Sequence, residues 1–344
     1  MRIITSLFQA RSPSDEGMTL SELLMGTIVG LIVINLAFMG FSWNRQIYLR
    51  DQQTNSVNQT LRTVFEIVGA DIRQAGEGFA EDPNFPSIEI TYNSVTENSE
   101  VSIRRSLLSV SLPVCGAIRG GSTDPVVVAD NAVAGCSVID EDNNGTGNGW
   151  PDTLDIWRNY RLSNGSTVRA YIFDGLGDGE FFTYSGESVT PTTGTVTSAS
   201  INANGQTWQN SYGNTGSSRI YLIEERRYRL NTNDNTLELI IDDDNSQISK
   251  VVGGLEKFEV IANIEQNLSG TSTPYTCNVI PPVDATSCNT TLPNTYVWSQ
   301  IRSIELQPRV LIPDAIADAA WFREIPEEQL EQSQKVFPRN ILNY

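Results

Sequence analysis

The stretch GMTLSELLMGTIVGL, Gly17 to Leu31, leads into the apolar run that decides the architecture of this chain. No charged side chain occurs over the 21 residues from Leu23 to Trp43. Since a helix rises about 1.5 Å per residue, this run is long enough to cross a hydrocarbon core of about 30 Å. A secretory signal has a shorter apolar region, about 7–15 residues, followed by a small-residue cleavage site. The run is therefore expected to remain as a membrane anchor.

The helical pattern continues beyond the apolar run into a polar segment. Apolar residues recur there mostly at steps of three and four, the spacing of one helix face; they are Ile47, Val57, Leu61, Val64, Phe65, Val68, Ile72 and Ala75. No proline interrupts residues 18–76, and Gly76 and Gly78 supply a helix stop. The sequence predicts one helix over 18–76, with the span at 23–43. Two helices hinged near residues 45–51 are the alternative.

Residues 77–344 have the pattern of a β-rich head. Short alternating segments between turns predict strands, at 88–91, 101–110, 126–128, 154–158, 168–173, 220–230, 237–241, 258–263 and 301–306. Residues 231–235 are expected to be a hairpin connection. Residues 185–218, rich in Ser and Thr, are expected to be a long surface loop or an inserted edge element. The predicted fold class is α+β: a long N-terminal transmembrane helix packed on an antiparallel β-rich head.

Composition excludes several function classes. The 344 residues include no histidine, so neither Ser-His-Asp chemistry nor a His-ligated metal exists here. The net charge of −18 argues against general nucleic-acid binding, and the arginines at 226, 227 and 229 are interpreted as surface charge. Paired carboxylates serve glycosidases, but no pair stands out among the 41 acidic residues. We expect no enzymatic activity.

The cysteines indicate the compartment. There are four, Cys115, Cys136, Cys277 and Cys288, and none lies in a CxxC pair. Pairing of nearest neighbours would close two short loops in an oxidising compartment, although three connectivities exist in principle. Four unpaired thiols in a cytosolic domain are the alternative. We predict disulfides, and hence a head outside the cytoplasm.

The start of the apolar run resembles the processing site of type IV prepilins. In that family a Gly precedes the cut, a hydrophobic residue becomes the new N-terminus, and a Glu stands at mature position five; here these are Gly17, Met18 and Glu22. The resemblance implies that prepilin peptidase removes residues 1–17 and that Met18 is N-methylated. It also implies that Glu22 bonds to the N-terminal amine of a neighbouring subunit, since an acid at the edge of hydrocarbon is costly unless paired.

Later segments resemble, in the right order, minor pilins of the PilW type, and the expected fold is therefore pilin-like. They are Asp71 to Gly76, Pro151 to Trp157, Glu224 to Ile241, Val251 to Val260, Trp298 to Leu306 and Val336 to Asn340. The proline that bends many major pilin helices is absent, since Met39 stands at its position. This favours a minor pilin or a pseudopilin.

The resemblance implies a minor pilin that primes assembly of a type IV pilus or sits at its tip, serving motility, adhesion or DNA uptake. The implied partners are prepilin peptidase, other minor pilins and the major pilin, the pilins being contacted through the N-terminal helix. The implied location is the inner membrane, crossed once, and after assembly the pilus at the cell surface. A minor pseudopilin of type II secretion is the nearest alternative.

An acidic stretch, residues 140–155, is a candidate calcium loop, because hard cations take oxygen ligands at alternate positions. Two EF-hand-like registers overlap, and their candidate ligands are Asp140, Asp142, Asn144, Asn148, Asp152 and Asp155. The register from Asp140 has Pro151 at its twelfth position, which cannot ligate through its side chain, whereas the register from Asn144 ends on Asp155. A solvated acidic turn is the alternative. With calcium, the chain could instead be a membrane-anchored, calcium-dependent adhesion module; no other cofactor is expected.

Overall fold

The computed structural model describes residues 19–79, 85–136, 151–176, 178–192, 195–213, 218–242, 244–268, 270–282, 286–292, 298–311 and 330–338. The helices in these segments are α1 (Leu20–Gln74), α2 (Asp152–Ser163) and the short 3-10 helix η1 (Trp298–Gln300). The strands are β1 (Ile88–Asn93), β2 (Asn98–Ser106), β3 (Leu112–Pro113), β4 (Val126–Asp130), β5 (Val168–Phe173), β6 (Gly179–Tyr184), β7 (Gly186–Thr192), β8 (Thr195–Asn202), β9 (Arg219–Asn231), β10 (Thr236–Ile241), β11 (Ser249–Gly253), β12 (Leu255–Leu268), β13 (Thr271–Cys277), β14 (Ile301–Val310) and β15 (Gln334–Val336).

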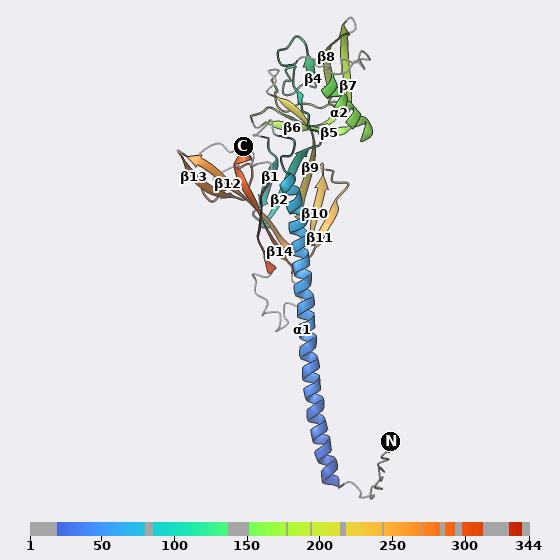
Figure 1. Ribbon diagram of the computed structural model, residues 1–344, viewed down its shortest axis with the longest axis vertical. Helices are drawn as coiled ribbons and strands as arrows, with labels where there is room; N and C mark the ends of the chain where they lie inside the picture. Colours follow the sequence, from blue (N-terminus) through green and yellow to red (C-terminus); the bar gives the residue numbers. More distant parts are fainter. Residues whose placement is uncertain are drawn as a thin grey trace, which may run out of the picture.

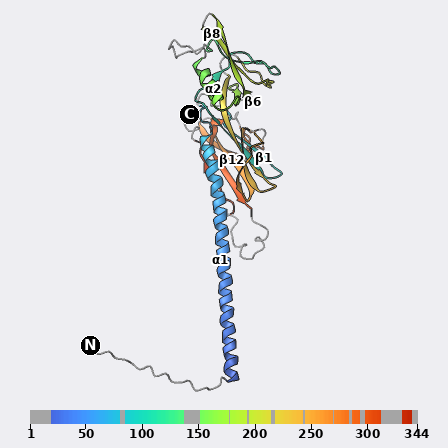
Figure 2. The ribbon, with the colours of Figure 1, turned by 90° about the vertical axis from the view of Figure 1, so that its right-hand side faces the viewer.

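Helix α1 is continuous over 55 residues, without the alternative hinge at 45–51. It begins with a capping box, in which the Glu22 N–H donates to Thr19 Oγ1 and the Thr19 N–H donates to the Glu22 carboxylate. Its first fully buried side chain is Leu61, and Val57, one turn earlier, already packs on the core. The part from Leu20 to Tyr48 stands clear of the described head (Figures 1 and 2). The C-terminal part of α1 enters the β structure and ends there.

Three antiparallel sheets form the described part of the head. The largest follows the order β1-β2-β9-β10-β11, and β3, β5 and β6 extend it along the first half of β9. A second sheet has the order β13-β12-β14-β15, and a third has the order β4-β8-β7. Strand β9 is central, because Glu100 to Ser106 of β2 pair with its second half and β5 pairs with its first. It therefore runs through both parts of the head.

The part of the head nearer the start of α1 has one core around the end of that helix. The helix contributes Leu61, Val64, Val68, Ile72 and Ala75. They pack with buried residues of β1, β2, β9 and β10 on one side and of β12, β14 and β15 on the other. One face of the helix end is thus buried against the two sheets (Figure 1), while Arg62, Glu66 and Ile67 on the other face stay exposed.

The part of the head farther from the start of α1 has its own core, and we call it the distal lobe: β3 to β8, α2 and the segment 203–213. Its buried aromatic side chains are Trp157, Phe182, Tyr184, Trp208 and Tyr212. A small aromatic cluster around Phe79, Phe85 and Tyr221 lies between the two cores. The distal lobe lies at the opposite end of the molecule from the start of α1 (Figure 1).

The distal lobe corrects one expectation and decides between two alternatives for another segment. Residues 154–158, expected to be a strand, belong to helix α2. The buried residues Leu154, Trp157 and Arg161 are spaced by three and four, and Asp155 lies in the first turn, where the helix dipole favours acids. Within 185–218, strands β7 and β8 form a hairpin paired to β4, which is the inserted element rather than a long loop.

Candidate functional site

The candidate site is the exposed apolar surface of α1. Large apolar side chains from Leu20 to Trp43 are between 46% and 83% exposed. An 18-residue window of the helix has a mean hydropathy of 2.2 and is entirely unburied. By length and composition α1 could cross a membrane once, with the β-rich head on one side. The described residues hold no other helix of this kind.

Glu22 lies at the start of this apolar surface. Its carboxylate accepts hydrogen bonds from the Thr19 N–H at 3.1 Å and from the Thr19 hydroxyl at 2.9 Å. Gly26 and Gly30 follow at steps of four on the same side of the helix, with no heavy atom near their open positions. The predicted cleavage residues, Gly17 and Met18, lie outside the described residues.

The opposite end of α1 is fixed to the head by a buried carboxylate. Asp71 lies in the last turns, where the helix dipole disfavours an acid, so partners are needed. Arg226 Nη1 donates to Asp71 at 2.8 Å, and the Tyr228 hydroxyl donates to its other oxygen. Burial and this hydrogen bond raise the pKa of Tyr228 well above its ordinary value. The helix is thereby tied to the middle of the large sheet.

Gly76 explains why the helix ends where it does. Its φ of +77° is a left-handed conformation that favours glycine, and an added Cβ would clash with the Trp298 ring. Its N–H donates to the Arg104 carbonyl at 3.1 Å. Gly76, predicted as the helix stop, is therefore required both by the backbone conformation and by its close packing against Trp298.

We expect Asp71→Asn to lower the free energy of unfolding by about 1–3 kcal/mol, because it weakens two hydrogen bonds to a buried group. The measurement is urea unfolding of the full chain in detergent. Asp51→Asn is the matched control, since Asp51 is an exposed acid on the same helix. Equal stability of the two variants would contradict the role given to Asp71.

The three arginines of β9 are all paired with acids. Arg226 contacts Asp71 and Glu224; Arg227 Nε lies 3.6 Å from Glu100, and Arg229 Nε lies 3.1 Å from Glu238. Their charges are balanced locally. The expectation of surface charge is wrong for Arg226, which is partly buried and holds the buried Asp71 of α1.

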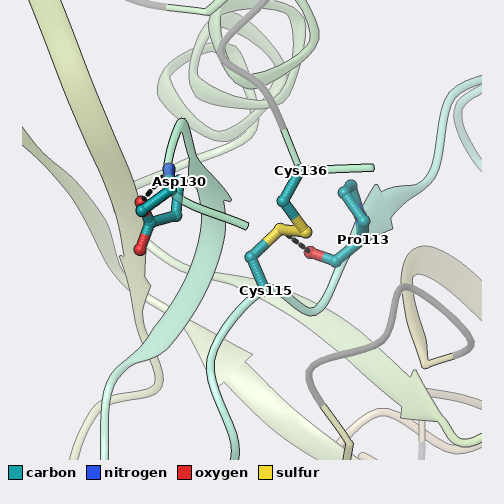
Figure 3. Close-up of a disulfide and its surroundings, with 5 residues drawn as sticks. Pro113, Cys115, Asp130 and Cys136 are labelled. Atoms are coloured by element: carbon teal, nitrogen blue, oxygen red, sulfur yellow. Dashed lines mark hydrogen bonds between the residues drawn. A yellow bond between two sulfur atoms is a disulfide. The ribbon is translucent and has the colours of Figure 1, made fainter. Parts of the chain in front are cut away.

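Both disulfides of the nearest-neighbour pairing are present, Cys115–Cys136 and Cys277–Cys288. In the first, Cys115 Sγ lies 4.0 Å from the Pro113 carbonyl oxygen (Figure 3). The Asp130 N–H donates to the Cys136 carbonyl at 2.7 Å. The second joins Cys277, the last residue of β13, to Cys288, which pairs with it in an isolated antiparallel β-bridge. Each disulfide ties a chain segment to the edge of a sheet.

Only two of the candidate calcium ligands lie in the described residues. Asp140, Asp142, Asn144 and Asn148 are outside them. Asp152 and Asp155 lie in the first turn of α2, where Asp155 accepts from Asn159 at 3.2 Å and lies 3.8 Å from Arg158. The described residues contain no group of three or more His, Cys, Asp or Glu that could hold a metal ion. Calcium binding stays a prediction, which calorimetry of the full chain with calcium tests.

An ion pair that the sequence did not indicate holds the β7–β8 hairpin to α2. Arg161 donates through Nε and Nη2 to the two oxygens of Glu187, both at 2.8 Å. Burial alone would raise the pKa of Glu187, but hydrogen bonds from Arg161 and Tyr184 outweigh it and hold that pKa below its ordinary value of 4.5. At Glu224, hydrogen bonds from two arginines likewise outweigh burial and lower the pKa.

These lowered pKa values predict acid lability. A carboxyl group with a lower pKa in the folded than in the unfolded chain stabilises the fold above the unfolded pKa, and loses that effect as the pH falls through the folded pKa. The free energy of unfolding should therefore fall below about pH 4.5. Urea unfolding at several pH values tests this. Glu187→Gln should give a shallower pH dependence; an unchanged slope would remove Glu187 from the explanation.

Comparisons of the chain with protein-family models, with curated proteins and with solved structures find no match. The function is therefore inferred from the residues and contacts described above.

Proposed function

We propose that this chain is a minor pilin of the PilW type, which primes assembly of a type IV pilus or sits at its tip. One observation supports this most: an apolar part of α1, of membrane length, is covered by no described residue, while the other end of the same helix is enclosed in a β-rich head. A helix of this kind can be anchored in a bilayer and later packed against other helices.

In this proposal Glu22 directs the packing. It is the one charged side chain in the described residues before Arg45, and it opens the span. Processing after Gly17 would create a free amine on Met18, and Glu22 would bond to that amine on a neighbouring subunit. The bond would neutralise an acid that is otherwise costly at the edge of hydrocarbon. The partners are prepilin peptidase and the other pilins, in the inner membrane first and in the surface pilus afterwards.

The distal lobe favours a position at the tip. It lengthens the head at the end farthest from the start of α1 (Figure 1). The added bulk makes regular repetition along a thin fibre difficult. Immunogold labelling of isolated pili should place the protein at fibre ends. Even labelling along the fibres would count against the tip.

The first experiment is mass spectrometry of the mature N-terminus from native cells. We expect a chain that begins at N-methylated Met18. A chain that retains Met1, or one cut elsewhere, would rule out pilin processing and leave an anchored β-rich surface protein.

A pseudopilin of type II secretion would share every feature above. The phenotype of a deletion strain distinguishes it from a minor pilin. Deletion should abolish twitching motility and DNA uptake and leave secretion of enzymes intact. Loss of secreted enzymes with normal motility would instead assign the chain to type II secretion.

A further inference from the structure

Asn35 is a polar side chain within the apolar part of α1 that the helix itself cannot satisfy. Its side chain is exposed, and Nδ2 donates to the Leu31 carbonyl at 2.8 Å. A carboxamide has two N–H donors and a carbonyl oxygen with two lone pairs. This one bond therefore leaves one N–H and the carbonyl oxygen without a partner in the described part of the chain.

The two hydroxyls of the span behave differently. Thr27 Oγ1 donates to the Leu24 carbonyl at 2.9 Å, and Ser42 Oγ donates to the Met39 carbonyl at 2.9 Å. Each hydroxyl has a single donor, and the helix backbone uses it. Thr27 and Ser42 can therefore face lipid at little cost, whereas Asn35 cannot.

Asn35 is also too deep for water to reach. It lies 12 residues after Leu23 and eight before Trp43. At 1.5 Å per residue, about 12 Å of helix separates it from the nearer end of the span. A carboxamide side chain is much shorter than that, so its partner must come from another helix at the same depth.

The side of α1 that carries Asn35 has the pattern of a helix-pairing seam. Along the helix, residues spaced alternately by four and by three lie on one side together with Asn35. We call this side the seam; it consists of Leu24, Ile28, Leu31, Asn35, Phe38 and Ser42. One asparagine in such a seam fixes the register and favours two strands. The seam is separate from the Glu22 side, because Asn35 is nine residues, or about two and a half turns, after Gly26.

We propose that two copies of this chain pair in the membrane as a parallel dimer through this seam, with the two Asn35 carboxamides bonded to each other. A second copy fits because a carboxamide both donates and accepts, and because an identical span places its own Asn35 at the same depth. This inference rests on the membrane span alone and does not depend on the proposed role in a pilus. It leaves the Glu22 side of each helix free for other contacts.

The test uses the purified full chain in vesicles of phosphatidylethanolamine and phosphatidylglycerol, where no other protein can serve as partner. All four native cysteines are in disulfides, so one added cysteine reports proximity. Leu31→Cys lies on the seam, and Val33→Cys lies on nearly the opposite side. Mild oxidation followed by a non-reducing gel should give dimers for Leu31→Cys and few for Val33→Cys.

Substitutions in the Leu31→Cys chain then assign the contact to Asn35. Hydrogen bonds between membrane helices change association by a factor of about 3 to 30. With Asn35→Leu, the protein-to-lipid ratio giving half-maximal crosslinking should therefore rise about 3- to 30-fold. Asn35→Gln, which keeps the amide, should retain most of the dimer. Thr27→Ala, which removes a backbone-bonded hydroxyl outside the seam, should have no effect.

Three outcomes would overturn the proposal: no dimer in vesicles, equal crosslinking at positions 31 and 33, or no effect of Asn35→Leu. The result is independent of N-terminal processing. Failure of the dimer therefore leaves the proposed pilus role standing, and an unprocessed N-terminus in native cells leaves the dimer standing.

Discussion

Glu22→Ala is expected to remove the protein from sheared pili while leaving its amount in the membrane unchanged. Placing an unpaired charge in a bilayer costs about 2.5–3.5 kcal/mol at the helix centre. The proposed bond to a neighbour's amine relieves part of that cost only in the assembled state. With alanine at this position there is no charge to stabilise, so assembly no longer gains this free energy relative to the membrane-bound state. The ratio of assembled to membrane-bound protein should therefore fall by up to roughly 60- to 300-fold.

The measurement is quantitative immunoblotting of sheared pili and of membranes from the same cells. Glu66→Ala is the matched control, since Glu66 is an exposed acid on the same helix whose ion-pair partner, Arg62, lies one turn away. The control should assemble normally. If Glu22→Ala reached wild-type levels in pili, the role given to this carboxylate would be wrong.

Arg104→Met is expected to cause the largest loss of stability in the head. The Arg104 side chain is 8% exposed and donates to Glu225 at 2.7 Å, to Glu89 at 2.6 Å and to the Pro86 carbonyl at 3.0 Å. Its removal leaves the Glu225 carboxylate, itself 5% exposed, without its counter-charge. Breaking a buried pair from one side costs about 3–5 kcal/mol.

Two further variants make this result interpretable, with the free energy of unfolding in urea as the readout. Arg302→Met removes an exposed partner of Glu265 and should cost less than about 1 kcal/mol. Arg104→Met combined with Glu225→Leu replaces both buried charges by apolar groups and should recover much of the loss. A double variant as unstable as the single one would mean that Arg104 acts through packing alone.

The elements with strong apolar periodicity could be predicted from the sequence. The helix α1 and strands such as β5 and β10 lie where the pattern placed them. In α1 the buried side chains recur at steps of three and four, whereas β5 and β10 are short, mostly apolar runs rich in β-branched or aromatic residues. The end of α1 was also predictable, because a helix commonly ends at a glycine that adopts a positive φ, as Gly76 does.

Helix α2 was missed because its apolar residues fit both the two-residue alternation of a strand and the three- and four-residue spacing of a helix. Leu154 and Ile156 alternate with polar residues and suggest a strand, yet Ile156 is 45% exposed and Trp157 is buried. Only the packing of Trp157 and Arg161 against the distal lobe decides between the two patterns.

Strands β7 and β8 and the buried ion pairs had no local pattern to reveal them. The hairpin is rich in Ser and Thr, and an ion pair to α2 holds it, through Arg161 and Glu187, 26 residues apart. Arg104 and Glu225 are 121 residues apart. Such partners are chosen by the tertiary fold, so a single sequence cannot identify them among many charged residues.

The shared strand β9 has a mechanical consequence. The distal lobe joins the rest of the head where β2 ends and β9 begins, and these antiparallel strands lie side by side from Glu100↔Arg229 to Ser106↔Ile223. Tension applied to the lobe and resisted by the anchored helix would pull along both strands at once. Their hydrogen bonds to β1 and β10 would then be loaded in shear and have to fail together, so the head can carry a pull from its far end to the membrane without unzipping.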